Sequence, residues 1–291
     1  MALAHHPLLH GPLVSSEASS PPVNAALRRR FRTIVDNARY SHFTRIPERI
    51  VRFLDSFHIQ FDREAVHERL LSHYLFIAVV DDAIDSGGEG VARIVFDRFS
   101  GVACGLNEIS RASDVAIVTE VLKSHVEDLN RKPILRSLQR AHHEVLRERT
   151  ATSVGAYIRH RKALGRATAR QSYLLIRSAL REPNQKLCRL MEEIGAVGCL
   201  VDSMIDIGDD QRSGLLGFDL TAVDYATLCF STAIAGLRVL AKRPSLMVLL
   251  AEAVLDNIRD RARARPCAIP QVESLSQHSA QSFHDSVAHP L

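Results

Sequence analysis

The chain has 291 residues, of which 46% are hydrophobic and 24% charged, a composition typical of one large globular domain or two small ones. Its 37 basic and 33 acidic residues give a formal net charge of +4, too mild for a nucleic-acid-binding protein, so no nucleic acid partner is expected. The five cysteines are scattered and lack Cys-x-x-Cys spacing, which favours a reducing, cytoplasmic compartment over a disulfide framework or a zinc site. Neither a transmembrane segment nor a signal peptide is expected.

Helical periodicity dominates the chain between two tails. Residues 1–23 are rich in Pro and Ser and are predicted to form a flexible leader, and residues 266–291 are predicted to form a C-terminal tail. Residues 24–265 are predicted to form a single all-α domain of about eight to ten helices, because clear strand alternation is absent. The predicted helical segments are 25–38, 63–80, 110–129, 134–150, 154–180, 186–207, 222–240 and 244–263, with breaks at 86–88, 131–133, 182–184, 213–214 and 243–244.

The first group of acids, Asp81, Asp82 and Asp85, directly follows an apolar helical segment. Asp81 and Asp85 lie one turn apart on one helix face, and the glycines after them predict that the helix ends there. Carboxylates at the negative end of a helix dipole repel one another unless a cation compensates them. Oxygen ligands suit Mg²⁺, which commonly binds together with a phosphate-bearing substrate.

The second group of acids lies more than a hundred residues later. Asp202, Asp206 and Asp210 are spaced i, i+4, i+8, and Asp209 falls on the same stripe. Several acids on one helix face, directly after an apolar segment, are a pattern typical of metal binding. Either group alone is equally compatible with capping or solvent-facing acids, but the two together favour a metal site.

A third segment, Tyr157 to Gly165, is basic. Tyr157, Arg161 and Gly165 share one helix face, and an arginine there offers paired donors to a diphosphate. Lys162 and Arg212 are further candidates for the same anion. The alternative is a solvent-facing basic turn.

These motifs resemble those of class I isoprenoid synthases. The run Asp81-Asp82-Ala83-Ile84-Asp85 looks like their aspartate-rich motif, and the Asp202/Asp206/Asp210 spacing looks like their second metal motif. The spacing Tyr157-x-x-x-Arg161-x-x-x-Gly165 resembles the diphosphate-sensing helix of microbial terpene synthases. The run 206–214 also resembles squalene and phytoene synthases, and 202–206 with 217–220 resembles trans-prenyl diphosphate synthases.

The chain departs from these families in several places. It has no Gly-Gly-Lys-Arg run near its N-terminus and no Arg-Arg-Gly after the first acids, which a chain-elongating prenyltransferase would use. It also has no Arg-Tyr pair near its C-terminus and no tryptophan, and only 5% of its residues are aromatic, although a cyclase usually lines its cavity with aromatic faces.

The resemblance implies an all-α bundle around an apolar cavity, with both acidic groups at its mouth. It implies a terpene synthase that ionises a linear prenyl diphosphate with the help of Mg²⁺, three ions by family analogy. Asp81, Asp82, Asp85, Asp202, Asp206 and Asp210 would hold the metal, Arg161 with Lys162 or Arg212 would hold the diphosphate, and Phe76, Tyr157 and Gly165 would line the cavity. A prenyl-coupling enzyme and a noncatalytic helical binding protein remain alternatives, and the sequence leaves open whether the chain forms a homodimer.

Overall fold

The fold is all-α, as the sequence predicts. A computed structural model describes residues 25–86, 90–101, 112–248, 250–252, 254, 255 and 259. In these residues no strand is formed, apart from an isolated bridge between Phe61 and Leu180. The α-helices are α1 (Ala25–Val35), α2 (Ser41–Thr44), α3 (Ile46–Ser56), α4 (Arg63–Asp85), α5 (Val91–Phe99), α6 (Asp114–Ser124), α7 (Asp128–Arg149), α8 (Val154–Ile176), α9 (Gln185–Arg212) and α10 (Ala222–Lys242). Short 3₁₀ turns occupy Ala38–Tyr40, Arg177–Ala179 and Pro244–Leu246.

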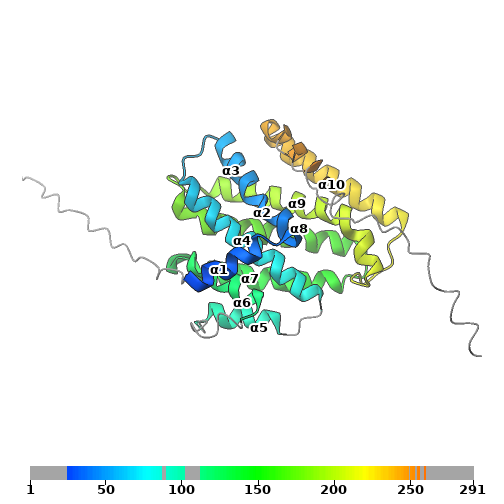
Figure 1. Ribbon diagram of the computed structural model, residues 1–291. Helices are drawn as coiled ribbons and strands as arrows, with labels where there is room; N and C mark the ends of the chain where they lie inside the picture. The colour runs from blue at the N-terminus through cyan, green and yellow to red at the C-terminus, as the bar shows by residue number, and fades with distance from the viewer. Residues whose placement is uncertain are drawn as a thin grey trace, which may run out of the picture.

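Helix α8 lies at the centre of the packing. It contacts α7 on one side and α9 on the other, and α4 and α10 touch it as well (Figure 1). A first core of buried side chains joins α1, α4, α5 and α6, and a second joins α3, α4, α8 and α9. A third, smaller core lies between α8, α9 and α10. Helix α10 lies along the outer edge of the molecule (Figure 1).

Helices α4, α6, α8, α9 and α10 begin with a side-chain cap. The side chains of Asp62, Ser153 and Asn184 accept hydrogen bonds from backbone N–H groups in the first turns of α4, α8 and α9. Thr221 and Asp224 form a reciprocal capping box at the start of α10. These caps fix where α4, α8 and α9 begin, and the lengths of α4 and α9 then carry the acidic groups to the far ends of these helices.

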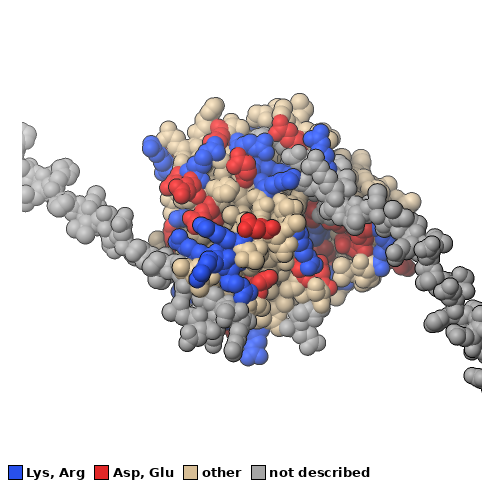
Figure 2. All heavy atoms as spheres, viewed as in Figure 1, with Lys and Arg blue, Asp and Glu red and all other residues tan. Residues whose placement is uncertain are grey.

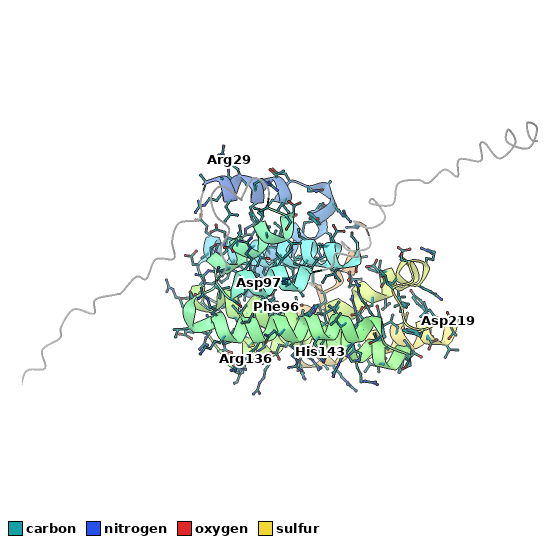
Figure 3. The ribbon with its side chains drawn as sticks, turned by 90° about the horizontal axis from the view of Figure 1, so that it is seen from below. Arg29, Phe96, Asp97, Arg136, His143 and Asp219 are labelled. Carbon is teal, nitrogen blue, oxygen red and sulfur yellow. The ribbon has the colours of Figure 1, made fainter. Side chains whose placement is uncertain are left out.

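The predicted break at residues 131–133 is wrong, because α7 starts at Asp128 and continues through Pro133. A proline this close to a helix start removes one backbone hydrogen bond, to the carbonyl of Leu129, a residue that is 91% exposed to solvent. Viewed from below, α7 runs across the molecule with α5 beside it, and the ring of Phe96 on α5 lies 6.1 Å from that of His142 on α7 (Figure 3).

The predictions for the two ends of the chain lie outside the described residues. The leader and the tail, residues 1–23 and 266–291, are not described, and neither are Gly87 and Gly88. Within the described residues, α10 is the helix that is long and apolar enough to cross a membrane by length and composition. That test alone is weak evidence, because core helices of soluble proteins also pass it.

The contact between α8 and α9 depends on two glycines. A Cβ atom on Gly195 would lie 2.5 Å from the carbonyl oxygen of Gly165 and 2.6 Å from the Cβ of Ala169. Real Cβ atoms do not approach other atoms this closely, so any side chain here would push the helices apart. Gly165 was expected to line a cavity, whereas in the structure it is a helix-packing residue.

We therefore expect Gly195→Ala to destabilise the fold by ~1–3 kcal/mol, the usual cost of overpacking. Gly198→Ala is a matched control on the same helix, because nothing lies within 4 Å of the added methyl group. It should be neutral or stabilise by up to ~1 kcal/mol, since alanine favours a helix over glycine. Chemical denaturation of both variants measures the difference, and equal stabilities would contradict the proposed contact.

Candidate functional site

The two acidic groups lie at the ends of neighbouring helices. Helix α4 continues beyond the predicted residue 80 to Asp85, so Asp81, Asp82 and Asp85 lie in its last turns. Helix α9 continues to Arg212, so Asp202, Asp206 and Asp210 occupy its last three turns. Both helices pack against α8, and the carboxylates of Asp202 and Asp81 influence each other. The structure thus brings the two groups together, although more than a hundred residues separate them in the sequence.

Arg161 of α8 lies between the two groups. Its side chain donates hydrogen bonds to Asp202 Oδ2 at 3.2 Å, to Ser203 Oγ at 2.6 Å and to Glu148 Oε1 at 3.2 Å. Its side chain is only 16% exposed, so these charge-assisted bonds compensate for its lost hydration. Arg161 therefore joins α7, α8 and α9 at the site.

Asp81 carries the strongest electrostatic signal of the site. Its surroundings raise the pKa of the carboxyl group to about 7, first because of lost solvation and then because of the charge of Asp85. The charges of Asp202 and Glu148 also raise this pKa, whereas Arg161 opposes them. The pKa of Asp210 is also raised, mainly by lost solvation and against the effect of Arg161. One guanidinium is therefore too little positive charge for the carboxylates around it.

Asp81 is exposed to solvent at the end of α4, although lost solvation and the neighbouring carboxylates raise its pKa. Acidic side chains gather in a hollow at the right of the space-filling view, between the ends of α4 and α9 as drawn in Figure 1 (Figure 2). A small ligand has access to the carboxylates from that side.

The remaining acids of the first group are held by basic partners. Asp82 forms an ion pair with Arg39 and accepts a hydrogen bond of 3.2 Å from the hydroxyl of Tyr40. Asp85 forms an ion pair with Arg149 at the end of α7. These contacts are partly exposed, so the partners can exchange without leaving a deeply buried charge behind.

The structure adds Glu148 to the site, which sequence reasoning missed. Its carboxylate is 14% exposed, one oxygen binds Arg161, and the other, Oε2, has no hydrogen-bond partner among the described residues. The hydroxyl of the fully buried Tyr157 approaches Arg161 and Ser203, but it makes no hydrogen bond of normal geometry within the described structure. The signal in the sequence was the short α7–α8 connection, which places the end of α7 beside the start of α8.

The other predicted anion-binding residues lie apart from Arg161. Arg212 forms an ion pair with Asp209, its neighbour on α9, at the exposed rim of the second group. Lost solvation lowers the pKa of Lys162, and the charges of its neighbours Arg166 and Arg238 lower it further. Arg238 belongs to α10, so Lys162 faces away from the acids and toward that helix.

The predicted cavity residues belong to packed cores. Phe76 is 4% exposed and packs in the core between α4, α5 and α6. Tyr157 is fully buried, and its ring lies 6.1 Å from that of Phe218. Neither side chain borders a space that admits water, so the structure places both in the core and not on the wall of an open chamber.

The donor set fits Mg²⁺ by its chemistry, because it consists of carboxylate oxygens, one of them without a partner. As the side chains lie, no three acidic, histidine or cysteine side chains in the described part of the chain stand together as a metal site. The ion pairs of Asp82, Asp85 and Asp202 account for this arrangement, since each draws a carboxylate toward an arginine.

Comparisons with protein-family models, curated proteins and solved structures gave no match.

Replacing Asp81 with Asn should change how stability depends on pH. A folded-state pKa of about 7, raised from 3.8, means that the folded chain holds a proton that the unfolded chain releases. This contribution to stability is complete below pH 3.8 and is lost as the pH rises through 7. We expect Asp81→Asn to be more stable than the wild type at pH 8, with a smaller difference at pH 5. Thermal denaturation in the presence of a chelator measures the stability difference between the variant and the wild type at each pH. A difference that does not change with pH would contradict the raised pKa of Asp81.

Arg161→Gln should destabilise the fold strongly, by ~3–5 kcal/mol, because it leaves the partly buried carboxylates of Glu148 and Asp202 without their cation. Arg159→Gln is the control, since Arg159 is an exposed arginine on the same helix and such substitutions change stability by about 0.5 kcal/mol or less. Urea denaturation of both variants is the measurement. Similar losses in the two variants would show that Arg161 does not organise the site.

Proposed function

We propose that the chain is a Mg²⁺-dependent terpene synthase, which converts a linear prenyl diphosphate to a terpene hydrocarbon or alcohol and releases diphosphate. The observation that supports this most is the convergence of the two acidic groups around Arg161. An excess of carboxylates over cations suits Mg²⁺ ions, to which a diphosphate would supply further oxygen ligands.

The acids of α4 and α9 would hold the metal, and these are Asp81, Asp82, Asp85, Asp202, Asp206 and Asp210. Bound Mg²⁺, three ions by analogy with the resembled family, would neutralise charge on the leaving diphosphate. Glu148 keeps an oxygen without a partner at the same place and would be a further acceptor.

Arg161 would change partners when the substrate binds. In the structure it holds Asp202, a predicted metal ligand. Once Asp202 turns to a cation, the guanidinium N–H that it held becomes available to a diphosphate oxygen, and the arginine stabilises the departing anion. Arg212 at the rim is the better second candidate for this anion, because Lys162 faces α10. Loss of a proton or capture of water would end the reaction, with diphosphate itself as the base.

A second candidate function is a noncatalytic helical binding protein. It is favoured by the burial of Phe76 and Tyr157, which leaves the predicted chamber filled at these positions. It is also favoured by the arginine partners that several acids already have. On this alternative, the acids stabilise helix ends and no prenyl diphosphate is turned over.

Incubation with C10, C15, C20 and C25 prenyl diphosphates and Mg²⁺, followed by product analysis, separates these functions. A product with one prenyl unit supports the synthase, whereas a product with two supports the prenyl-coupling alternative. We expect Asp82→Asn and Asp206→Asn each to reduce turnover by at least ~100-fold, because each removes charge stabilisation from the transition state.

Asp97→Asn on α5 is the matched control and should keep full activity, because Asp97 pairs with Arg93 on its own helix (Figure 3). Circular dichroism should show unchanged helicity in all three variants. Full turnover of Asp82→Asn, or full turnover in excess chelator, would rule out the proposed enzyme.

A further inference from the structure

Helix α10 has two apolar faces, and the described structure covers only one of them. Leu228, Thr232 and Val239 are buried against the rest of the molecule. On the opposite face, Val223 is 74% exposed, Phe230 69% and Leu237 62%. Except for Leu129 and Leu146, all the exposed large hydrophobic side chains among the described residues lie between Val223 and Leu255. An apolar surface of this kind marks an interaction site on a soluble protein.

The exposed face has the spacing of a helix-pairing surface. Val223, Phe230 and Leu237 recur every seven residues, and Ala226 and Ala233 lie three residues after the first two of them. This is the a and d pattern of a coiled coil, in which small residues at d allow close approach of the backbones. Large apolar side chains that alternate with the small Ala226 and Ala233 along one stripe suit close packing against a second helix.

The two ends of α10 carry opposite charge. The exposed Asp219 precedes the helix and Asp224 lies in its first turn, and Figure 3 places Asp219 at one end of the molecule. Arg238, Lys242 and Arg243 lie at the other end, where Lys162 of α8 is near Arg238 and Lys242 pairs with Glu193 of α9. A second α10 in antiparallel orientation would place acidic residues against basic ones at both ends and would oppose the helix dipoles.

We infer that α10 pairs with α10 of a second copy of this chain, antiparallel about a two-fold axis at Phe230. The spacing fits this symmetry, because Val223 and Leu237 are each seven residues from Phe230. Val223 of one copy then meets Leu237 of the other, and the two Phe230 rings meet on the axis, as an isologous interface requires.

An anionic membrane is a poorer partner for the same face. A helix that lies on a membrane carries basic residues along its length, whereas the N-terminal end of α10 is acidic.

The proposed interface is small. A helix of 21 residues is ~30 Å long, and one helix pair covers less than the ~800 Å² per partner of a standard interface. The dimer is therefore expected to dissociate on dilution.

Sedimentation velocity over a range of concentrations tests the interface. The 32.3 kDa chain should shift from dimer to monomer on dilution. Phe230→Asp and Leu237→Asp should each raise the dissociation constant at least ~10-fold, because both replace central apolar anchors with charge. Leu129→Asp, at an even more exposed leucine on α7, should leave the dissociation constant unchanged. A wild type that stays monomeric throughout, or equal effects of all three substitutions, would overturn the inference.

Cross-linking tests the orientation in a Cys229→Ser background, with that background as the control. A mixture of Val223→Cys and Leu237→Cys chains should cross-link to each other, while either variant alone should not. Cross-linking of Val223→Cys with itself would indicate parallel helices and would overturn the proposed geometry. Flotation of the monomeric wild type with vesicles of anionic lipid would instead assign the face to a membrane.

Discussion

The site depends on the largely buried guanidinium of Arg161. Arg161 holds Asp202 and Glu148 from two different helices, and it opposes the charge on Asp81 and Asp210. One guanidinium cannot balance four carboxylates, so part of the negative charge is relieved only by protonation or by a ligand. The carboxylates therefore outnumber the cation that holds them, a charge imbalance that a divalent cation would relieve.

The fold makes this arrangement possible by bringing α8 and α9 into close contact. Gly165 and Gly195 let the two backbones touch, and Arg161 lies one turn before Gly165 on α8. Because the arginine is this close to the glycine contact, it reaches the backbone of Cys199 and the side chains of Asp202 and Ser203 on α9. The site is thus built on rigid helices, and its charges are fixed by the same contact that stabilises the bundle.

The sequence predicted the all-α fold because helical patterns are local, whereas the expectation that the acids meet came from the family resemblance. Helical periodicity is a property of each segment, and the spacing of Asp202, Asp206 and Asp210 fixes one helix face. It did not predict Glu148, since that residue reaches Arg161 only through the packing of α7 on α8. It also misplaced Phe76, Tyr157 and Gly165, because burial in a core and exposure to a cavity look alike in a pattern of apolar residues. The break predicted at residues 131–133 was wrong because Pro133 lies near the start of α7 and removes only one backbone hydrogen bond, to the carbonyl of the solvent-exposed Leu129.

The most direct test of the account is the binding of Mn²⁺, as a paramagnetic substitute for Mg²⁺, to the full chain with diphosphate, followed by electron paramagnetic resonance of the free ion. If the acids of α4 and α9 share cations, Asp82→Asn and Asp202→Asn should each weaken binding as much as both substitutions together. If each group binds metal alone, the two losses should add. Additive losses, or no saturable binding by the wild type, would contradict a shared site.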